Sequence, residues 1–441
     1  MRPRPKATLF LTILLAVGTC YYYFGLLLPQ LRRQDQANGI ATHYGYGGDF
    51  YPIWLTGRAL LMHRSDPYTR EMTRNIQTGL YGRPMDANRP LDHPVDYHAF
   101  AYPLYADLLA APMLPFSFDT VRILLSLLLA PLTAASVILW LRVLGLRVQP
   151  SALATLIILT LANYPVLEGL YQQQLALLVG VALAASLALL VQNRLLVSGI
   201  FLAFASVKPQ MVWLVAIFML VWCSGDWKRR KTMALSFLLT IALLGLSSQV
   251  ALPGWFSGWR HVLAGYSAYT LPPLPQLVLG RLFGSAVALG AFALAVAIGW
   301  KARRALPGSQ KFLVALSFTL AVTPLLLSSA GAAFDQVVML PGIFWLWSRR
   351  EEILNASRPV RVLMLAAIVA LSWQWVAGCA VALLSLAFPE WARTSAVLFL
   401  PMRMEASLPF AVIALLSLLA LRLVRGRTIN VETALADSNP V

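Results

Sequence analysis

The sequence predicts an all-α polytopic membrane protein, a bundle of about 12 transmembrane helices with a long first extracytoplasmic loop. Hydrophobic residues make up 59% of the 441 and charged residues only 12%, roughly half of their usual share in soluble domains. Apolar runs at 7–28, 121–141 and 360–386 reach or approach the ~20 residues that cross a ~30 Å hydrocarbon core. Because lipid offers no partners to unpaired amides, these runs are expected to be helical.

The positive charges indicate which side of the membrane each helix end faces. The formal net charge is +17, and the basic residues gather in short clusters at the ends of apolar runs. This pattern is typical of cytoplasmic anchors beside anionic lipid headgroups, and it argues against a groove for nucleic acid. The clusters are Arg2/Arg4/Lys6, Arg142/Arg147, Lys228–Lys231, Lys301/Arg303/Arg304, Arg349/Arg350 and Arg422/Arg425/Arg427.

Twelve helices place every basic cluster, and both termini, in the cytoplasm. The first apolar run exceeds the apolar region of a signal peptide, so we expect it to be retained. A break at Lys208-Pro209 is needed to keep the segment Lys228–Lys231 inside. The predicted helices are 7–28, 119–141, 151–168, 173–192, 195–207, 209–223, 232–250, 276–300, 311–329, 334–348, 360–384 and 407–424.

The segment 29–118 is the predicted extracytoplasmic loop. Half of the 18 acidic residues fall between Asp35 and Asp119, together with four of the five histidines. A membrane protein that concentrates titratable groups on one face is expected to do its chemistry there, although solvated loops are polar for other reasons too. Apolar residues at near-helical spacing in 51–63 predict a helix lying at the membrane interface, ended by a turn at 65–68.

The domain organisation is simple. We expect a single transmembrane domain over residues 1–426 and a disordered cytoplasmic tail over 427–441. The three cysteines, Cys20, Cys223 and Cys379, have no metal-ligand spacing and are interpreted as small packed hydrophobes.

Asp49 is the first candidate for chemistry. It follows Gly45, Gly47 and Gly48, which let the backbone approach a ligand closely. A carboxylate at a partly desolvated boundary can take the proton from a hydroxyl that attacks an electrophilic carbon, which makes Asp49 a candidate general base. The alternative is that Asp49 only caps the helix that follows it.

Lys208 is the second candidate, because apolar residues flank it at the predicted helix break. An ammonium group there must snorkel to the interface or bind an anion, and a lipid phosphate would supply one. Arg260 and His261 lie in another outer loop and are further candidates for phosphate contact. For those two, interfacial anchoring is an equally good interpretation.

Carboxamides and carboxylates at the outer helix ends form a third group. Glu168 and Gln172–Gln174 lie where the third predicted helix meets the fourth, and Asp335 starts the tenth. Carboxamides suit hydroxyl-rich ligands because they donate and accept hydrogen bonds at once. They can equally satisfy a buried turn, and Asp335 can equally be a helix cap.

In the order and spacing of these residues the chain resembles the GT-C superfamily of membrane glycosyltransferases, and within it glycosyltransferase family 87. The resemblance rests on Asp49 after the first helix, Gly57 in the next, Asp66-Pro67-Tyr68, Tyr102-Pro103-Leu104, Gln172–Gln174, Lys208-Pro209 and Phe334-Asp335. The family usually has Gly-Gln at Tyr171-Gln172, and often Tyr-Asp at Phe334-Asp335.

The resemblance implies a GT-C-like bundle that transfers a hexose, mannose above all, from a polyprenyl-phosphate donor to an extracytoplasmic glycan or glycolipid acceptor. Asp49 would be the base of an inverting reaction, Lys208 would hold the donor phosphate, and Gln172 and Asp335 would line the site. The expected location is the inner membrane of a bacterium. Neither an Asp-x-Asp motif nor a nucleotide loop is found, so no metal or cofactor is expected.

Two other classes of function stay open at this point. A lipid-linked polysaccharide polymerase or ligase would use similar substrates, but its large loop is expected later in the chain. A lipid or sugar transporter would place polar residues at mid-membrane and often shows inverted repeats, whereas here they gather at the outer boundary. The sequence leaves the sugar and the acceptor unidentified.

Overall fold

The computed structural model describes residues 5–37, 39, 48–86, 88–89, 98–266, 270–326, 333–403 and 407–424. Every regular element in these ranges is a helix, which confirms the predicted all-α fold. The tail predicted to be disordered, 427–441, lies outside them.

Helices suited to crossing a membrane dominate the described part of the chain. Six are long and apolar enough to span a bilayer, and a bent pair makes a seventh. The six are Lys6–Ala37, Phe118–Val143 (α6), Trp227–Ala251 (α12), Arg281–Ala302 (α15), Arg358–Ala387 (α19) and Ala396–Leu421, which ends within α22 (Ser407–Val424). Shorter apolar helices are α9 (Leu175–Val191), α10 (Leu195–Ala205), α11 (Pro209–Ser224) and α16 (Gln310–Leu326). The protein is therefore a polytopic membrane protein.

The first helix is longer than predicted. It was expected to end at Leu28, but α1 (Pro5–Cys20) continues through a π-helical segment, Tyr21–Leu27, into α2 (Leu28–Ala37). Pro29 lacks the N–H of a regular helix, and the wider π-turn just before it accommodates this loss. The residues that follow are good helix formers, so the helix runs on to Ala37.

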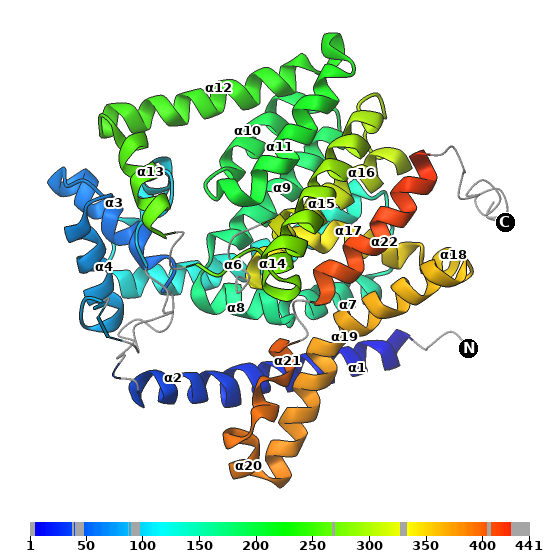
Figure 1. Ribbon diagram of the computed structural model, residues 1–441, viewed down its shortest axis with the longest axis horizontal. Coiled ribbons are helices and arrows are strands. Elements are labelled where there is room, and N and C mark those ends of the chain that lie inside the picture. Colours follow the sequence, from blue (N-terminus) through cyan, green and yellow to red (C-terminus); the bar gives the residue numbers. More distant parts are fainter. Residues whose placement is uncertain are drawn as a thin grey trace.

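A group of helices at one end of the molecule forms the predicted outer region. It comprises α3 (Tyr51–His63), α4 (Arg70–Tyr81), α5 (Tyr105–Leu109) and α13 (Trp255–Tyr266). Figure 1 shows α3, α4 and α13 on the left, whereas α1 begins and α22 ends on the right. The Trp259 indole on α13 donates to the Ala101 carbonyl at 3.0 Å, which ties α13 to the segment before α5. The helix predicted at 51–63 is α3.

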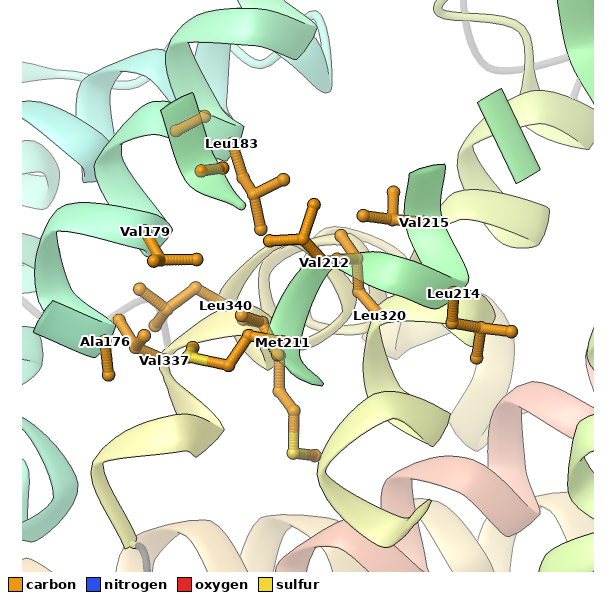
Figure 2. Packing of buried hydrophobic residues seen from close by; sticks show 14 of the residues in the cluster. Ala176, Val179, Leu183, Met211, Val212, Leu214, Val215, Leu320, Val337 and Leu340 are labelled. Atoms are coloured by element: carbon orange, nitrogen blue, oxygen red, sulfur yellow. The ribbon is translucent and has the colours of Figure 1, made fainter. Parts of the chain in front are cut away.

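The core is built from short helices that other helices surround. Side chains of α9, α11 and α16 meet those of the 3₁₀ helix η4 (Ala333–Met339) and of α17 (Leu340–Ser348) (Figure 2). Gly180 lets α9 approach closely, because a Cβ there would lie 3.1 Å from Val337 Cγ1. Small residues at such contacts are typical of helix packing in membranes. This packing fixes η4 against the start of α9, where the polar residues lie.

The predicted third helix, 151–168, is broken in the structure. α7 (Pro150–Leu161) and α8 (Tyr164–Gln172) meet at 60°. Pro165 cannot donate to Leu161, so a continuous helix would lose one backbone hydrogen bond here. The Tyr164 amide donates instead to Gln374 Oε1 of α19 at 3.1 Å, which holds α8 in its turned position.

Candidate functional site

Asp49 lies just before α3, but it does not cap that helix. The N-cap residue is Phe50, which makes no side-chain capping bond. Asp49 Oδ2 instead accepts a hydrogen bond from Gln174 Nε2. Asp49 Oδ1 lies 3.9 Å from His98 Nδ1, and both side chains are largely buried, at 14% and 15% exposure. The carboxylate is thus directed toward the junction of α8 and α9.

Gln174 joins Asp49 to a buried cation. Its Nε2 donates to Asp49, and its Oε1 accepts from Lys208 Nζ at 3.2 Å. Gln173 makes this possible, because its left-handed backbone (φ 55°) ends α8 and turns the chain into α9. The single amide of Gln174 therefore donates to a carboxylate and accepts from an ammonium group.

Lys208 makes a buried ion pair with Asp335. Nζ lies 2.5 Å from Asp335 Oδ1, and the side chains are 6% and 4% exposed. The ring of Phe334 stands 4.5 Å from the ammonium, a cation–π contact. Lys208 sits at the break between α10 and α11, as predicted, but it does not snorkel to the surface. Asp335, the third residue of η4, is likewise more than a helix cap.

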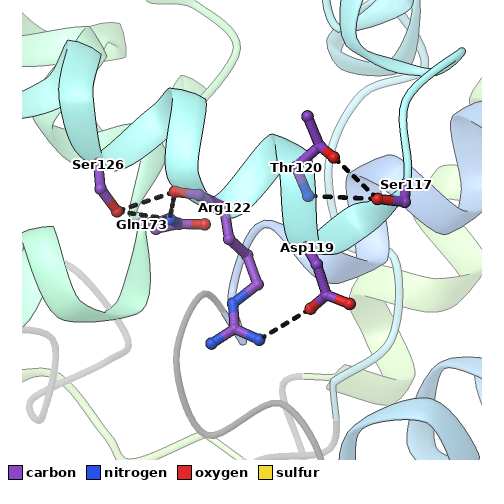
Figure 3. Close-up of polar contacts among 6 residues, drawn as sticks. All are labelled: Ser117, Asp119, Thr120, Arg122, Ser126 and Gln173. Atoms are coloured by element: carbon purple, nitrogen blue, oxygen red, sulfur yellow. Dashed lines mark hydrogen bonds and ion pairs between the residues drawn. The ribbon is translucent and has the colours of Figure 1, made fainter.

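Gln173 fixes the end of α8 to α6. Its Nε2 donates to the Arg122 carbonyl at 2.5 Å and to Ser126 Oγ at 3.1 Å (Figure 3). Arg122 also pairs with Asp119 one turn earlier, at 3.3 Å. The two hydrogen bonds of Gln173 hold the α8–α9 junction, and hence Gln174, in place.

The polar chain Asp49–Gln174–Lys208–Asp335 draws on four separate parts of the sequence. A model of glycosyltransferase family 87 matches residues 100–329, more than half of the chain. The chain belongs to glycosyltransferase family 87. The searches of curated proteins and of solved structures found no match.

Membership of family 87 makes this protein a membrane glycosyltransferase, which takes a sugar from a donor and gives it to an acceptor. It favours the transferase over the polymerase and transporter interpretations of the sequence. The matched segment contains Gln174 and Lys208, whereas Asp49 and Asp335 lie outside it. The hydrogen bonds of the polar chain therefore connect the family segment to residues on both sides of it.

The other predicted site residues of this family 87 chain make no direct bond with the polar chain within the described residues. Gln172 is the last residue of α8, and no hydrogen bond joins it to the four residues within the described ranges. Arg260 and His261 are exposed on α13 and, in the same ranges, make no hydrogen bond or ion pair with them. The functional roles of these three remain predictions.

Two residues at the site were not singled out from the sequence alone. Gln174 was one of three consecutive glutamines, and His98 was one of four histidines in the loop. His98 has a left-handed backbone (φ 43°), uncommon for a residue other than glycine and a frequent feature of functional sites. Among the described residues, no group of three or more His, Cys, Asp and Glu side chains is arranged to hold a metal ion.

A hydrogen bond between α5 and the α10–α11 break joins the loop that was predicted to be extracytoplasmic to the site. The Tyr105 hydroxyl donates to the Ser206 carbonyl at 2.9 Å, two residues before Lys208. Beside Tyr105, Asp107 is fully buried, and its Oδ1 accepts from Thr56 Oγ1 at 3.1 Å. Burial raises the pKa of Asp107 well above its ordinary value, against a smaller lowering by the Thr56 hydrogen bond.

Proposed function

We propose that this family 87 protein transfers a hexose, with mannose as the expected sugar, from a polyprenyl-phosphate donor to a glycan or glycolipid acceptor. The reaction takes place on the extracytoplasmic side of a bacterial inner membrane and inverts the anomeric centre. The observation that carries the proposal is the polar chain. In it, the amide of Gln174 lies between the carboxylate of Asp49 and the ammonium of Lys208 and bonds to both. A single displacement needs a base on one side of the sugar and a cation on the other.

In the proposed reaction Asp49 takes the proton from the acceptor hydroxyl. The acceptor oxygen forms a bond to the anomeric carbon, and the bond from that carbon to the phosphate oxygen breaks. The electron pair of the broken bond leaves with the polyprenyl phosphate, where Lys208 stabilises the charge. Attack and departure on opposite faces of the carbon produce the inversion.

Lys208 has hydrogen-bonding capacity left for a phosphate. An ammonium group carries three N–H donors, and two of them reach Gln174 Oε1 and Asp335 Oδ1. Among the described residues the third donor has no hydrogen-bond partner, which leaves it available to a ligand oxygen. Because Asp335 and Gln174 fix the ammonium before any donor binds, little reorganisation is needed on binding.

An apolar cavity near the polar chain supports a lipid-linked donor. It encloses about 330 Å³ between α1, α7, α17, α19 and α22. Asn163 and Leu340 lie on its lining, one residue before α8 and one residue after η4. The cavity therefore borders α8 and η4, the two segments that carry Glu168 and Asp335, although neither of these side chains lines it. An isoprenoid tail has the apolar surface that such a lining accepts.

We propose that the reaction needs no metal ion. A polyprenyl phosphate is already a good leaving group, and Lys208 supplies a fixed positive charge beside it. Transfer rates unchanged by an excess of EDTA would support this part of the proposal, and restoration of lost activity by a divalent cation would contradict it.

The decisive experiment compares wild type with Asp49→Asn in nanodiscs, with a panel of polyprenyl-phosphate sugars and acceptor extracts. Asparagine keeps a carbonyl oxygen for Gln174 but cannot take a proton, so we expect transfer to fall by roughly 10²- to 10⁴-fold. Asp119→Asn is the matched control, since its side chain is 74% exposed.

Each outcome of this experiment has a distinct meaning. Free polyprenyl phosphate that appears only when Asp49 is intact supports the proposal and identifies the sugar. Equal turnover by both proteins would assign the base elsewhere, with Asp335 the next candidate. If no donor is consumed by wild type, the polyprenyl-phosphate donor is wrong.

A further inference from the structure

Glu168 carries a buried oxygen without a partner. Within the described ranges, Glu168 Oε2 is shielded from solvent and makes no hydrogen bond. Leaving a buried acceptor unpaired is costly, so native proteins rarely keep one unless a ligand, water or ion completes it. The proposed mechanism makes no use of this residue.

Glu168 lies near the two carboxylates of the polar chain. Asp49 and Asp335 both exert an electrostatic effect on Glu168. The next residue, Gly169, packs against Phe334, where an added Cβ would lie 3.2 Å from Phe334 Cβ. Phe334 is the ring that faces the Lys208 ammonium. Glu168 therefore lies on the wall of the site that η4 and α8 share.

Glu168 Oε2 takes no part in the hydrogen bonds of the polar chain. Asp49, Gln174, Lys208 and Asp335 bond to one another, but none of these bonds includes Glu168 Oε2. If the Glu168 carboxyl group is ionised, this oxygen can only accept a hydrogen bond, for example from a hydroxyl group. If it is protonated, the carboxyl group can either donate or accept one. Hydroxyl groups are the polar groups that a hexose brings to a site.

Resting on the proposed function, we propose that Glu168 is a specificity-determining residue that hydrogen-bonds one hydroxyl group of the transferred sugar. A site built around such a bond rejects a sugar that lacks the hydroxyl, because Glu168 Oε2 then stays buried and unpaired. Glu168 would therefore select among hexoses, whereas Asp49 and Lys208 act on any of them.

The test measures kcat/KM for a polyprenyl-phosphate hexose and for analogues that each lack one ring hydroxyl. For wild type, we expect kcat/KM to be roughly 10- to 100-fold lower with one of the analogues than with the complete sugar. For Glu168→Ala, we expect kcat/KM with the complete sugar to fall by a similar factor. With that analogue, kcat/KM of Glu168→Ala should equal that of wild type. Glu168→Gln should retain part of the discrimination, and Glu71→Gln, a control on the exposed face of α4, should retain all of it.

Donor binding, followed as a shift in thermal unfolding of the same variants, separates this proposal from the proposed function. If wild type binds the donors without transferring sugar, the transferase mechanism fails, but a hydroxyl preference lost in Glu168→Ala still supports the role of Glu168. If Glu168→Ala keeps the wild-type penalty for every analogue, in rate and in binding, the proposal is wrong. If wild type binds none of these donors, both proposals are wrong.

Discussion

Lys208 and Asp335 form an ion pair in which Nζ and Oδ1 are 2.5 Å apart and both side chains are almost wholly buried. Removing one member of a buried pair leaves the other charge uncompensated. We expect Lys208→Met and Asp335→Leu each to destabilise the protein by about 3–5 kcal/mol, and the double variant to lose much less than the sum. Thermal unfolding of the four proteins in detergent measures this coupling. The exposed pair Arg349–Glu352 is the control.

Glu352→Gln is expected to cost no more than about 1 kcal/mol, because Arg349 and Glu352 are solvated. Additive losses for Lys208→Met and Asp335→Leu would contradict the interpretation of the pair as one buried unit.

Gln174→Leu removes the amide that joins Asp49 to Lys208. We expect kcat to fall by roughly 10- to 100-fold, because both charged groups lose a hydrogen bond that orients them. Gln172→Leu, two residues earlier at the end of α8, is expected to have a much smaller effect, since within the described residues that side chain makes no hydrogen bond to the polar chain.

The measurement is single-turnover sugar transfer with the donor found for wild type. Gln192→Leu, at the exposed end of α9, controls for the loss of an amide. A larger loss in Gln172→Leu than in Gln174→Leu would reverse the assignment and favour the sequence-based prediction for Gln172.

Asp107 couples stability to pH. Burial raises the pKa of Asp107 above its ordinary value of 3.8, so the folded protein holds this proton more tightly than the unfolded chain. The stabilisation is complete below pH 3.8 and is lost as the pH rises toward the folded pKa, by at most about 1.4 kcal/mol per pH unit. Asp107→Asn should remove this part of the pH dependence.

Thermal unfolding midpoints of wild type and Asp107→Asn from acid to alkaline pH give the comparison. We expect the unfolding midpoint of Asp107→Asn to rise relative to that of wild type as the pH increases. Parallel curves would show that Asp107 does not bind its proton more tightly in the folded protein.

Gly199 lets α10 and α12 pack closely. A Cβ at Gly199 would overlap Ser236 Oγ and the Met233 carbonyl, and would lie 2.9 Å from the Phe237 amide. We expect Gly199→Ala to destabilise the protein by about 1–3 kcal/mol through this overlap. Gly245→Ala on α12 is the matched control, because a Cβ there meets nothing within 4 Å, and it is expected to be neutral or slightly stabilising. Equal unfolding midpoints for the two variants would contradict this packing argument.

Apolar run length and proline position predicted most of the fold, and they failed where distant contacts decide. The break at Lys208-Pro209 was predictable because a proline and the positive-inside rule agreed. The bend at Pro165 was not, although the proline is visible, because Gln374 supplies the partner that holds α8 aside. Gln374 is 210 residues away in sequence. A local pattern cannot indicate such a partner.

The site was predictable to the extent that its residues are locally unusual. Lys208 and Asp335 are charges among apolar residues and Asp49 follows a glycine-rich segment, and the structure brings all three together. The choice between Gln172 and Gln174 was not predictable, because the left-handed backbone of Gln173 decides which side chain faces the site. Three identical residues carry no signal for that conformation.

Because Gln174 is an amide, it separates the charges of Asp49 and Lys208 without passing a proton between them. An amide neither takes up nor releases a proton at neutral pH, so the ammonium of Lys208 cannot discharge into the carboxylate of Asp49 along this path. With a carboxylic acid in its place, the two charges could neutralise each other whenever the site stood empty. Under the proposed mechanism, the amide keeps the resting protein in the state of charge that the next round of transfer requires.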